Sequence, residues 1–298
     1  MKGMHHDSQL SAPDRALGLV EIHLAVVLFG FAGLFGKAIH ASPAEITFGR
    51  TGFAALALFA ALAVSRTGFS IRSPRSLFTL ALAGVLLALH WFAFFQSIQV
   101  STVAIGLLTF ATFPLFVTFL EPFFFGEKLE TYDVAAAAAV MAGLALVIPS
   151  FDFSNRVTQG VLWGLLSGFS FAALSLLNRM FVSKYPPLTV TFYQFVFAAM
   201  ASSPFALASG TGVTGKDLVL MVVLGVVCTA AAHGLFIASL RHIRARTASV
   251  ITGLEPVYGM VFALVLLGEA PSLRTVFGGA VILGAVFFSM VRKPGISP

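Results

Sequence analysis

The chain has 298 residues, of which 58% are hydrophobic and only 10% are charged, and its formal net charge is +6 at pH 7. A soluble domain carries roughly 25% charged residues, so this composition excludes an ordinary soluble protein and makes lipid the solvent for much of the surface. The basic residues stand in short segments between apolar runs, a pattern that sets membrane orientation and argues against nucleic acid as a partner.

Ten apolar runs follow one another along the chain. Each has about the 20 residues that a helix needs to span a bilayer, and they are expected at 17–39, 45–64, 77–98, 102–120, 131–149, 159–182, 187–208, 217–239, 246–267 and 272–291. Strands are not expected, because backbone groups in lipid must bond within their own segment and the runs lack the alternation of a barrel. The predicted fold class is an all-α integral membrane protein with ten transmembrane helices.

Lys and Arg are distributed unequally between the two sides of this predicted topology. With the N-terminus placed inside, the inner segments hold 13 of them and the outer segments 4: Lys2, Arg15, Arg66, Arg72, Arg75, Lys128, Arg179, Lys184, Arg241, Arg244, Arg246, Arg292 and Lys293 against Lys37, Arg156, Lys216 and Arg274. Positive charge concentrates on the cytoplasmic side. The bias predicts a multi-pass protein of the plasma membrane (the inner membrane in a bacterium), with cytoplasmic tails at 1–16 and 292–298.

Two halves of the chain share a spaced motif. Pro114 precedes the pair Gly126-Glu127 by 12 residues, and Pro256 precedes Gly268-Glu269 by the same interval. The motif predicts two five-helix repeats, 17–150 and 151–291. An odd number of spans per half means that the halves insert with opposite orientation, the inverted repeat that many secondary transporters use for alternating access.

A second set of residues keeps similar spacing. His90 lies 24 residues before Pro114 and His233 lies 23 residues before Pro256. With the doubled Pro to Gly-Glu motif, Leu254-Glu255-Pro256 and Asn178-Arg179, the region 17–291 resembles the EamA-type branch of the drug/metabolite transporter superfamily. The resemblance implies a ten-helix inverted-repeat transporter of amino acids, other metabolites or drugs, and some members of the branch export aromatic amino acids. It implies a small-molecule substrate and leaves the oligomeric state open.

Pro114 and Pro256 each lie in the middle of an expected span. A proline removes one helix hydrogen bond and frees a carbonyl. The pair is expected either to form two hinges beside the substrate path or to make static kinks that improve packing.

Glu255, His90 and His233 are ionisable groups deep in the membrane. Glu255 is the tenth residue of its span, about 14 Å deep at 1.5 Å per residue, and an ionisable residue at that depth is a candidate functional group. It could bind a substrate ammonium or carry a proton, or it could be tied to neighbouring helix groups. Either histidine could sense protons or serve only as an interhelical contact.

Other polar and aromatic residues complete the expected substrate cavity, which we expect spans one, three, four, six, eight and nine to line. The candidate substrate-binding residues are His90, Trp91, Trp163, Asn178, Tyr193, Gln194, His233, Glu255 and Tyr258. Trp163 could instead anchor its helix at the interface. Arg50, whose equivalent in the second half is Gln194, is expected to be structural, either reaching outward to the helix end or pairing internally with Glu45 or another acid.

The predicted function is secondary transport by alternating access, with export of amino acids and a preference for aromatic ones. Drug-like or cationic solutes are the alternative substrates. A membrane-embedded enzyme would need a nucleophile elbow, a metal motif or a phosphate loop, and a channel would need charged rings or a filter-like loop. None of these motifs occurs in the sequence, so the protein is predicted to be no enzyme and to use neither cofactor nor metal.

Overall fold

The computed structural model describes residues 12–65, 68–71, 73–126, 128–150, 152–179, 181, 184–243 and 245–292. These residues contain helices and loops and no strand. Lys2, Arg66, Arg72, Arg244 and Lys293 of the charge pattern lie outside the described residues, as does Glu127 of the first Gly-Glu pair. Most of the two expected tails lies outside them too, and α1 begins at Ala12, before the expected start of the first span.

The helices follow the expected runs in order. They are α1 (Ala12–Ala32), α2 (Phe35–Ala38), α3 (Pro43–Ser65), α4 (Pro74–Val100), α5 (Val103–Phe110), α6 (Phe113–Phe125), α7 (Thr131–Val147), α8 (Arg156–Arg179), α9 (Pro187–Ser209), α10 (Gly215–Gly225), the π-helix η1 (Val226–Ala231), α11 (Ala232–Ser239), α12 (Ala245–Thr252), α13 (Glu255–Phe262), the π-helix η2 (Ala263–Leu267) and α14 (Leu273–Arg292).

Nine helical segments in the described part are long and apolar enough to cross a membrane, when α1 with α2, α5 with α6 and the two pieces that carry π-turns are each taken together. The remaining one, α7, is equally apolar but has only 17 residues. The all-helical membrane fold is therefore confirmed. The count of ten spans stays a prediction that depends on α7.

Two spans are interrupted just before the paired prolines. Helix α5 ends at Phe110 and α6 restarts with Pro114 in its first turn, while α12 ends at Thr252 and α13 restarts with Pro256 in its first turn. Both motifs end on a left-handed glycine, Gly126 at φ 69° and Gly268 at φ 68°. Glycine takes this conformation without the steric penalty of a Cβ atom. The repeat in sequence thus corresponds to a repeat in backbone shape.

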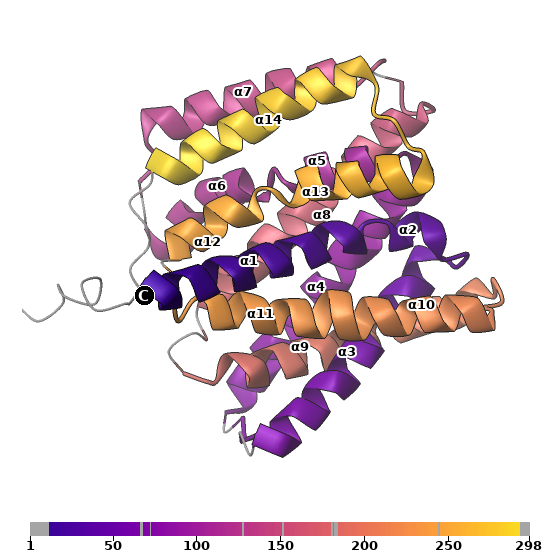
Figure 1. Cartoon of the computed structure of the whole chain (residues 1–298), viewed down its shortest axis with the longest axis vertical. Coiled ribbons are helices and arrows are strands. Elements are labelled where there is room, and N and C mark those ends of the chain that lie inside the picture. Colours follow the sequence, from indigo (N-terminus) through magenta and orange to yellow (C-terminus); the bar gives the residue numbers. More distant parts are fainter. Residues whose placement is uncertain are drawn as a thin grey trace, which may run out of the picture.

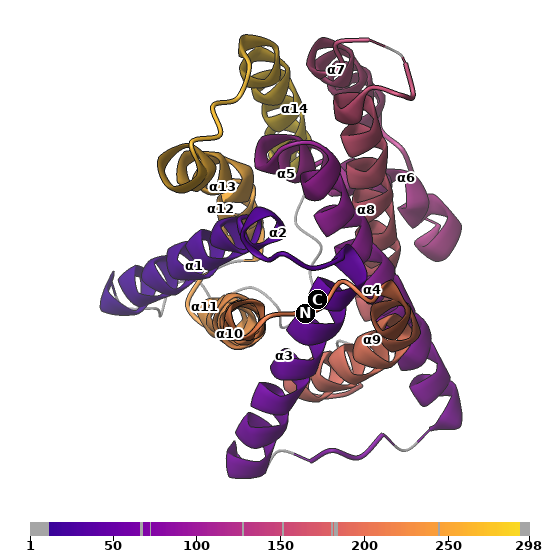
Figure 2. The same cartoon turned by 90° about the vertical axis from the view of Figure 1, so that its right-hand side faces the viewer.

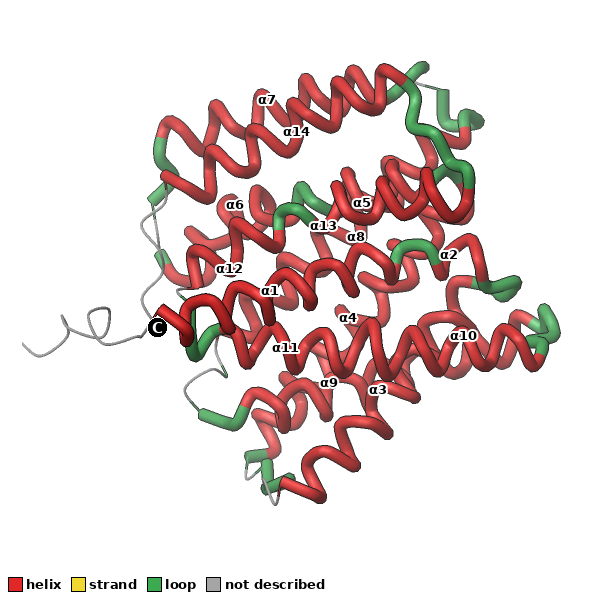
Figure 3. Tube along the Cα trace, in the orientation of Figure 1, coloured by secondary structure: helices red, strands yellow, loops and turns green. Residues whose placement is uncertain are grey.

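The bundle is built from pairs of helices that span the two halves. Figure 1 shows α7 beside α14 at one edge, and Figure 2, which looks along the helices, places α3 with α9 at the opposite edge. Between these pairs, α4 packs against α8 and α1 against α11. In Figure 3 green loops interrupt the first span between α1 and α2 and the ninth between α12 and α13.

Gly84 brings helices α4 and α9 into close contact. A Cβ atom at Gly84 would collide with the Cβ of Phe197 and would lie 3.0 Å from the carbonyl oxygen of Gln194. Neither atom belongs to the flexible end of a side chain, so only glycine permits this approach of the two helices.

Gly225 makes the equivalent contact in the other half, where α10 meets α3. A Cβ atom there would lie 2.7 Å from the carbonyl oxygen of Arg50 and 2.8 Å from the Cβ of Phe53. The sequence interval from Phe53 to Phe197 equals that from Arg50 to Gln194. The contacts of the two halves therefore match when the halves are exchanged, as they would about a twofold axis. Whether this axis lies in the membrane plane stays a prediction.

We expect Gly84→Ala and Gly225→Ala to destabilise the bundle by about 1–3 kcal/mol each, the usual cost of overpacking. Gly52→Ala is the matched control, because a Cβ at Gly52 in α3 would meet no atom within 4 Å. Thermal unfolding of purified protein, followed by size-exclusion chromatography, measures the difference. A transition in both variants as high as that of the control would contradict the close packing described here.

Candidate functional site

A cavity of about 1050 Å³ lies within the bundle, between the two halves. Aromatic rings form much of its wall and a few polar side chains project into it. Its lining includes Phe29, Arg50, His90, Trp91, Phe94, Phe110, Phe113, Pro114, Thr118, Glu121, Phe171, Asn178, Thr191, Gln194, Phe195, His233, Phe236, Glu255, Pro256, Phe287 and Ser289. Spans two, seven and ten contribute residues as well as the six expected spans, because the cavity extends along the bundle.

The cavity runs from the middle of the bundle to one end. Its lining reaches Asn178 in the last turn of α8, Glu121 near the end of α6 and Met290 near the end of α14. Figure 1 shows that this is the end at which the described chain begins and finishes. The paired prolines lie at its inner part, so each helix break faces the cavity.

The two histidines occupy equivalent places on opposite sides of the cavity. His90 Nδ1 lies 2.8 Å from the Ser167 hydroxyl and 3.1 Å from the Ser167 carbonyl oxygen, and its ring lies 4.9 Å from that of Phe171. His233 Nδ1 lies 2.9 Å from the Thr229 carbonyl oxygen, and its ring lies 5.1 Å from that of Phe29. A carbonyl can only accept, so Nδ1 of His233 carries a proton, and in the neutral ring Nε2 is then the acceptor.

Gln194 and Asn178 form a polar pair in the wall. The Gln194 amide donates to Asn178 Oδ1, and Gln194 is only 5% exposed. Their mutual bond satisfies part of their capacity and orients the remainder toward the cavity that both line. Together with Trp91, His90, His233 and Glu255, they are the predicted binding residues that the structure brings to one place.

Glu255 begins α13, directly after the break in its span. Among the residues that the structure describes, no side chain forms a hydrogen bond or ion pair with its carboxylate. A second carboxylate shares the cavity with Glu255. Glu121, 2% exposed, also lines the cavity, but it lies 3.5 Å from Arg179 in an ion pair near the cavity mouth.

Arg50 makes none of the contacts expected for it, since among the described residues no carboxylate lies within 4 Å of its guanidinium group. It stays 5% exposed in the middle of the bundle instead of reaching the helix end. Glu45 bonds the Ser42 amide and the Thr211 hydroxyl instead. Arg50 lines the cavity, with its Nε donating to the Thr229 hydroxyl at 2.8 Å.

Three of the predicted binding residues lie away from the cavity lining. The Tyr193 hydroxyl donates to the Phe69 carbonyl oxygen at 2.9 Å, and the Trp163 ring packs edge-on against Phe92. Tyr258 packs in a separate apolar cluster around Ile22. On helices that are apolar on most faces, the sequence does not reveal which face a polar residue occupies.

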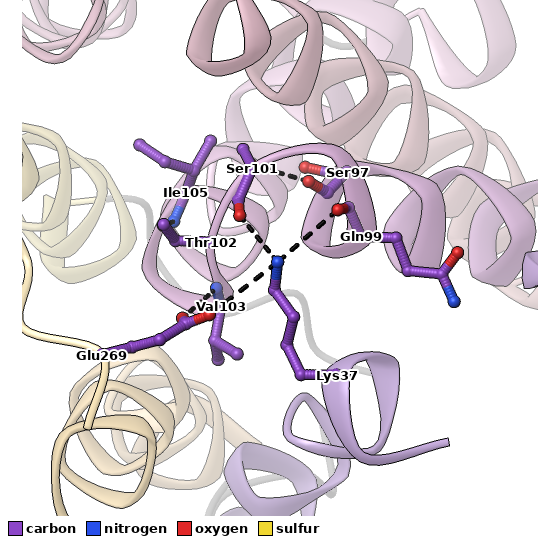
Figure 4. Close-up of polar contacts among 8 residues, drawn as sticks. All are labelled: Lys37, Ser97, Gln99, Ser101, Thr102, Val103, Ile105 and Glu269. Atoms are coloured by element: carbon purple, nitrogen blue, oxygen red, sulfur yellow. Dashed lines mark hydrogen bonds and ion pairs between the residues drawn. The ribbon is translucent and has the colours of Figure 1, made fainter. Parts of the chain in front are cut away.

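A polar cluster, called the seal below, joins helices at the end of the bundle away from Ala12 and Arg292, and Figure 4 shows its contacts. Lys37 Nζ donates to the Ser101 carbonyl oxygen at 2.8 Å and lies 3.8 Å from Glu269 Oε1. Glu269 Oε2 accepts from the Val103 amide at 2.9 Å, where the free amides of the first turn of α5 favour a carboxylate. Glu269 belongs to the second half and the other three to the first, so the contact joins the halves.

The described residues form no candidate metal site. Within the described ranges, no three His, Cys, Asp or Glu side chains come close enough to hold a metal ion. The site consists of side-chain donors, two carboxylates, a guanidinium group and aromatic rings.

A bundle of apolar helices around a partly polar cavity that reaches one end is the architecture of a membrane transporter. The family comparison agrees: the model of the EamA-like transporter family matches residues 16–148 and again residues 158–291. The chain belongs to the EamA-like transporter family. The two matches correspond to the two halves, and the family is one of transporters rather than enzymes.

Relatives and a solved structure extend the comparison. An uncharacterized transporter of Archaeoglobus fulgidus is 28% identical over 91% of this chain and 96% of its own length. The uncharacterized transporter YxxF of Bacillus subtilis is 26% identical over 98% and 95%. An S-adenosylmethionine uptake transporter of Rickettsia prowazekii is 25% identical over 71% of each chain. One crystal structure, 20% identical, shares the fold at a TM-score of 0.63 over 96% of this chain and 99% of its own.

Tyr193 and Gln194 are neighbours in α9 that face different surroundings, which makes them a matched pair. We expect Tyr193→Phe to lower stability by about 1 kcal/mol through one lost hydrogen bond and to leave the KM for transport unchanged. Gln194→Leu should raise that KM, because the amide lines the cavity. Transport kinetics and thermal unfolding of both variants measure the two effects. A raised KM in the tyrosine variant alone would reverse the assignment.

Proposed function

We propose that this protein exports α-amino acids, with aromatic ones preferred, across the plasma membrane by alternating access. The observation that carries the proposal is the cavity itself, where the carboxylate of Glu255, which has no ion-pair or hydrogen-bond partner among the described side chains, shares the lining with many aromatic rings. Glu255 supplies a partner for a substrate ammonium, and the rings around His90 suit a flat apolar side chain. An ammonium taken from water without such a partner would cost several kcal/mol.

Access from one end supports alternating access. The cavity reaches the end of the bundle at which the described chain begins and finishes. The Lys and Arg distribution predicts that this end faces the cytoplasm, and a cavity open on that side is the state in which an exporter loads its substrate. At the other end the contact of Lys37 with Ser101 and Glu269 holds the halves together. The breaks before Pro114 and Pro256 supply hinges at matching places in the two halves.

S-adenosylmethionine is the second candidate substrate, because several relatives carry the name S-adenosylmethionine uptake transporter. It combines an α-amino acid group with an aromatic base, so the same cavity chemistry would recognise it. If the protein transported S-adenosylmethionine in preference to phenylalanine, its function would be transport of this metabolite and not export of amino acids.

The proposed function is tested by counterflow. We expect proteoliposomes loaded with unlabelled phenylalanine to accumulate labelled phenylalanine transiently, with saturation and with inhibition by tyrosine and tryptophan. Empty liposomes give the background. Glu255→Gln should lower kcat/KM by about tenfold or more, since it removes the charge that meets the ammonium. No phenylalanine movement above background, with clear movement of S-adenosylmethionine or a cationic drug, would overturn the choice of substrate.

The seal at the far end predicts a change in accessibility. Lys37→Met removes the ammonium that joins Ser101 to Glu269, so the far end should open more often. A cysteine at Ala32, which lines the cavity, should then react about tenfold faster with an impermeant thiol reagent added at that end, in a Cys228→Ala background.

Lys216→Met is the matched control for this experiment. Lys216 is an exposed lysine at the same end of the bundle, in the first turn of α10. Labelling that Lys37→Met leaves as slow as in the control would show that the contact does not hold this end closed.

A further inference from the structure

Arg50 presents unused hydrogen-bond donors to the cavity. It lies about 10 Å along α3 from the start of that helix, at 1.5 Å per residue, and is 5% exposed. A guanidinium group has five N–H donors. Its Nε–H donates to the Thr229 hydroxyl. Across the described residues no partner is found for its two terminal nitrogens, and they are not sealed from the cavity that Arg50 lines.

The surroundings of Arg50 hold the guanidinium plane in place. Its central carbon lies 4.0 Å from the centroid of the Trp91 ring and 5.8 Å from that of Phe95. The Thr229 hydroxyl donates in turn to the Leu224 carbonyl oxygen at 2.8 Å, an interval of five residues across the π-helix η1. The π-turn therefore orients Thr229 toward Arg50. The ring face compensates part of the charge and leaves the edge with the terminal nitrogens free.

The equivalent residue in the other half behaves differently. The side-chain amide of Gln194 donates a hydrogen bond to Asn178. Arg50 has no comparable side-chain partner for its terminal nitrogens among the described residues. A buried guanidinium without a carboxylate partner is costly in a membrane protein. Packing alone would be served by a neutral residue, as the Gln194 position shows. The charge at Arg50 therefore calls for an anionic group from outside the chain.

We propose that Arg50 is the substrate's carboxylate ligand, binding it through the two terminal nitrogens of the guanidinium edge, so that the site selects zwitterions. This inference rests on the proposed function. It adds a ligand for the substrate carboxylate, which Glu255, as the partner of the ammonium, does not supply. Glu255 lines the same cavity but forms no ion pair with Arg50 within 4 Å. The two opposite charges are thus kept apart and face one space. An α-amino acid bridges them, its carboxylate on Arg50 in the paired geometry that guanidinium favours and its ammonium on Glu255.

The test measures binding separately from transport. The thermal midpoint of the purified full-length protein is titrated with phenylalanine, methionine and S-adenosylmethionine, and with the decarboxylated amines of each. In the wild-type protein at least one amino acid should bind about ten- to a hundredfold more tightly than its amine, the factor expected for hydrogen bonds to a charged group. Arg50→Gln should abolish this preference and leave amine binding nearly unchanged. Arg50→Lys, which keeps the charge without the fork, should restore part of it.

Arg156→Gln is the matched control, because Arg156 is an exposed arginine at the start of α8, outside the cavity. It should keep the full preference for the amino acid. An Arg50→Gln variant that loses amino acid and amine affinity by the same factor, a wild type without preference, or a wild type that binds none of the six ligands would each overturn the proposal.

The outcome separates the two proposals. Preference for the carboxylate without counterflow would refute amino-acid transport and leave Arg50 as the anion ligand. Counterflow without that preference would support the transport function and remove Arg50 from substrate recognition.

Discussion

Because lipid offers no partner to a free backbone amide or carbonyl, this chain can interrupt its spans only where protein or water surrounds the gap. The breaks before Pro114 and Pro256 satisfy this requirement, since both prolines line the internal cavity. The same constraint explains where charge lies. Arg50 and Glu255 both line that cavity, which offers a charged group a polar surrounding that lipid does not.

The two halves share geometry more than chemistry. The glycine contacts, the proline breaks and the two histidines with their phenylalanine neighbours recur at equivalent places, which makes a cavity with similar walls on both sides. The polar groups do not recur in the same way. Arg50 corresponds to Gln194 and Glu255 corresponds to Phe113, so a pseudo-symmetric frame holds an asymmetric pair of charges. A zwitterion, which has unlike ends, matches such a frame better than a symmetric solute would.

The sequence predicts the frame because each span carries its own signal, about 20 apolar residues with loops between them. The breaks could be anticipated from two prolines at matching positions. The contact of Arg50 with Thr229 could not be anticipated, because Thr229 is 179 residues away in the sequence and a π-turn orients it toward Arg50. Glu45 is nearer to Arg50 in the sequence, but its carboxylate accepts from the Ser42 amide and from the Thr211 hydroxyl, which is 166 residues away. Tyr193 and Gln194 show the same limit, since adjacent residues of one apolar helix meet different surroundings.

The seal around Lys37 has a consequence for how the sequence can drift over evolutionary time. Its closest acceptor is the main-chain carbonyl of Ser101, and Glu269 accepts from the main-chain amide of Val103. Main-chain atoms survive substitution of the residues that bear them, so positions 101 and 103 can vary without loss of the bond. Selection on this contact therefore falls on two side chains only. Related chains should keep a cationic donor at position 37 and a carboxylate at position 269, as Arg with Asp would provide.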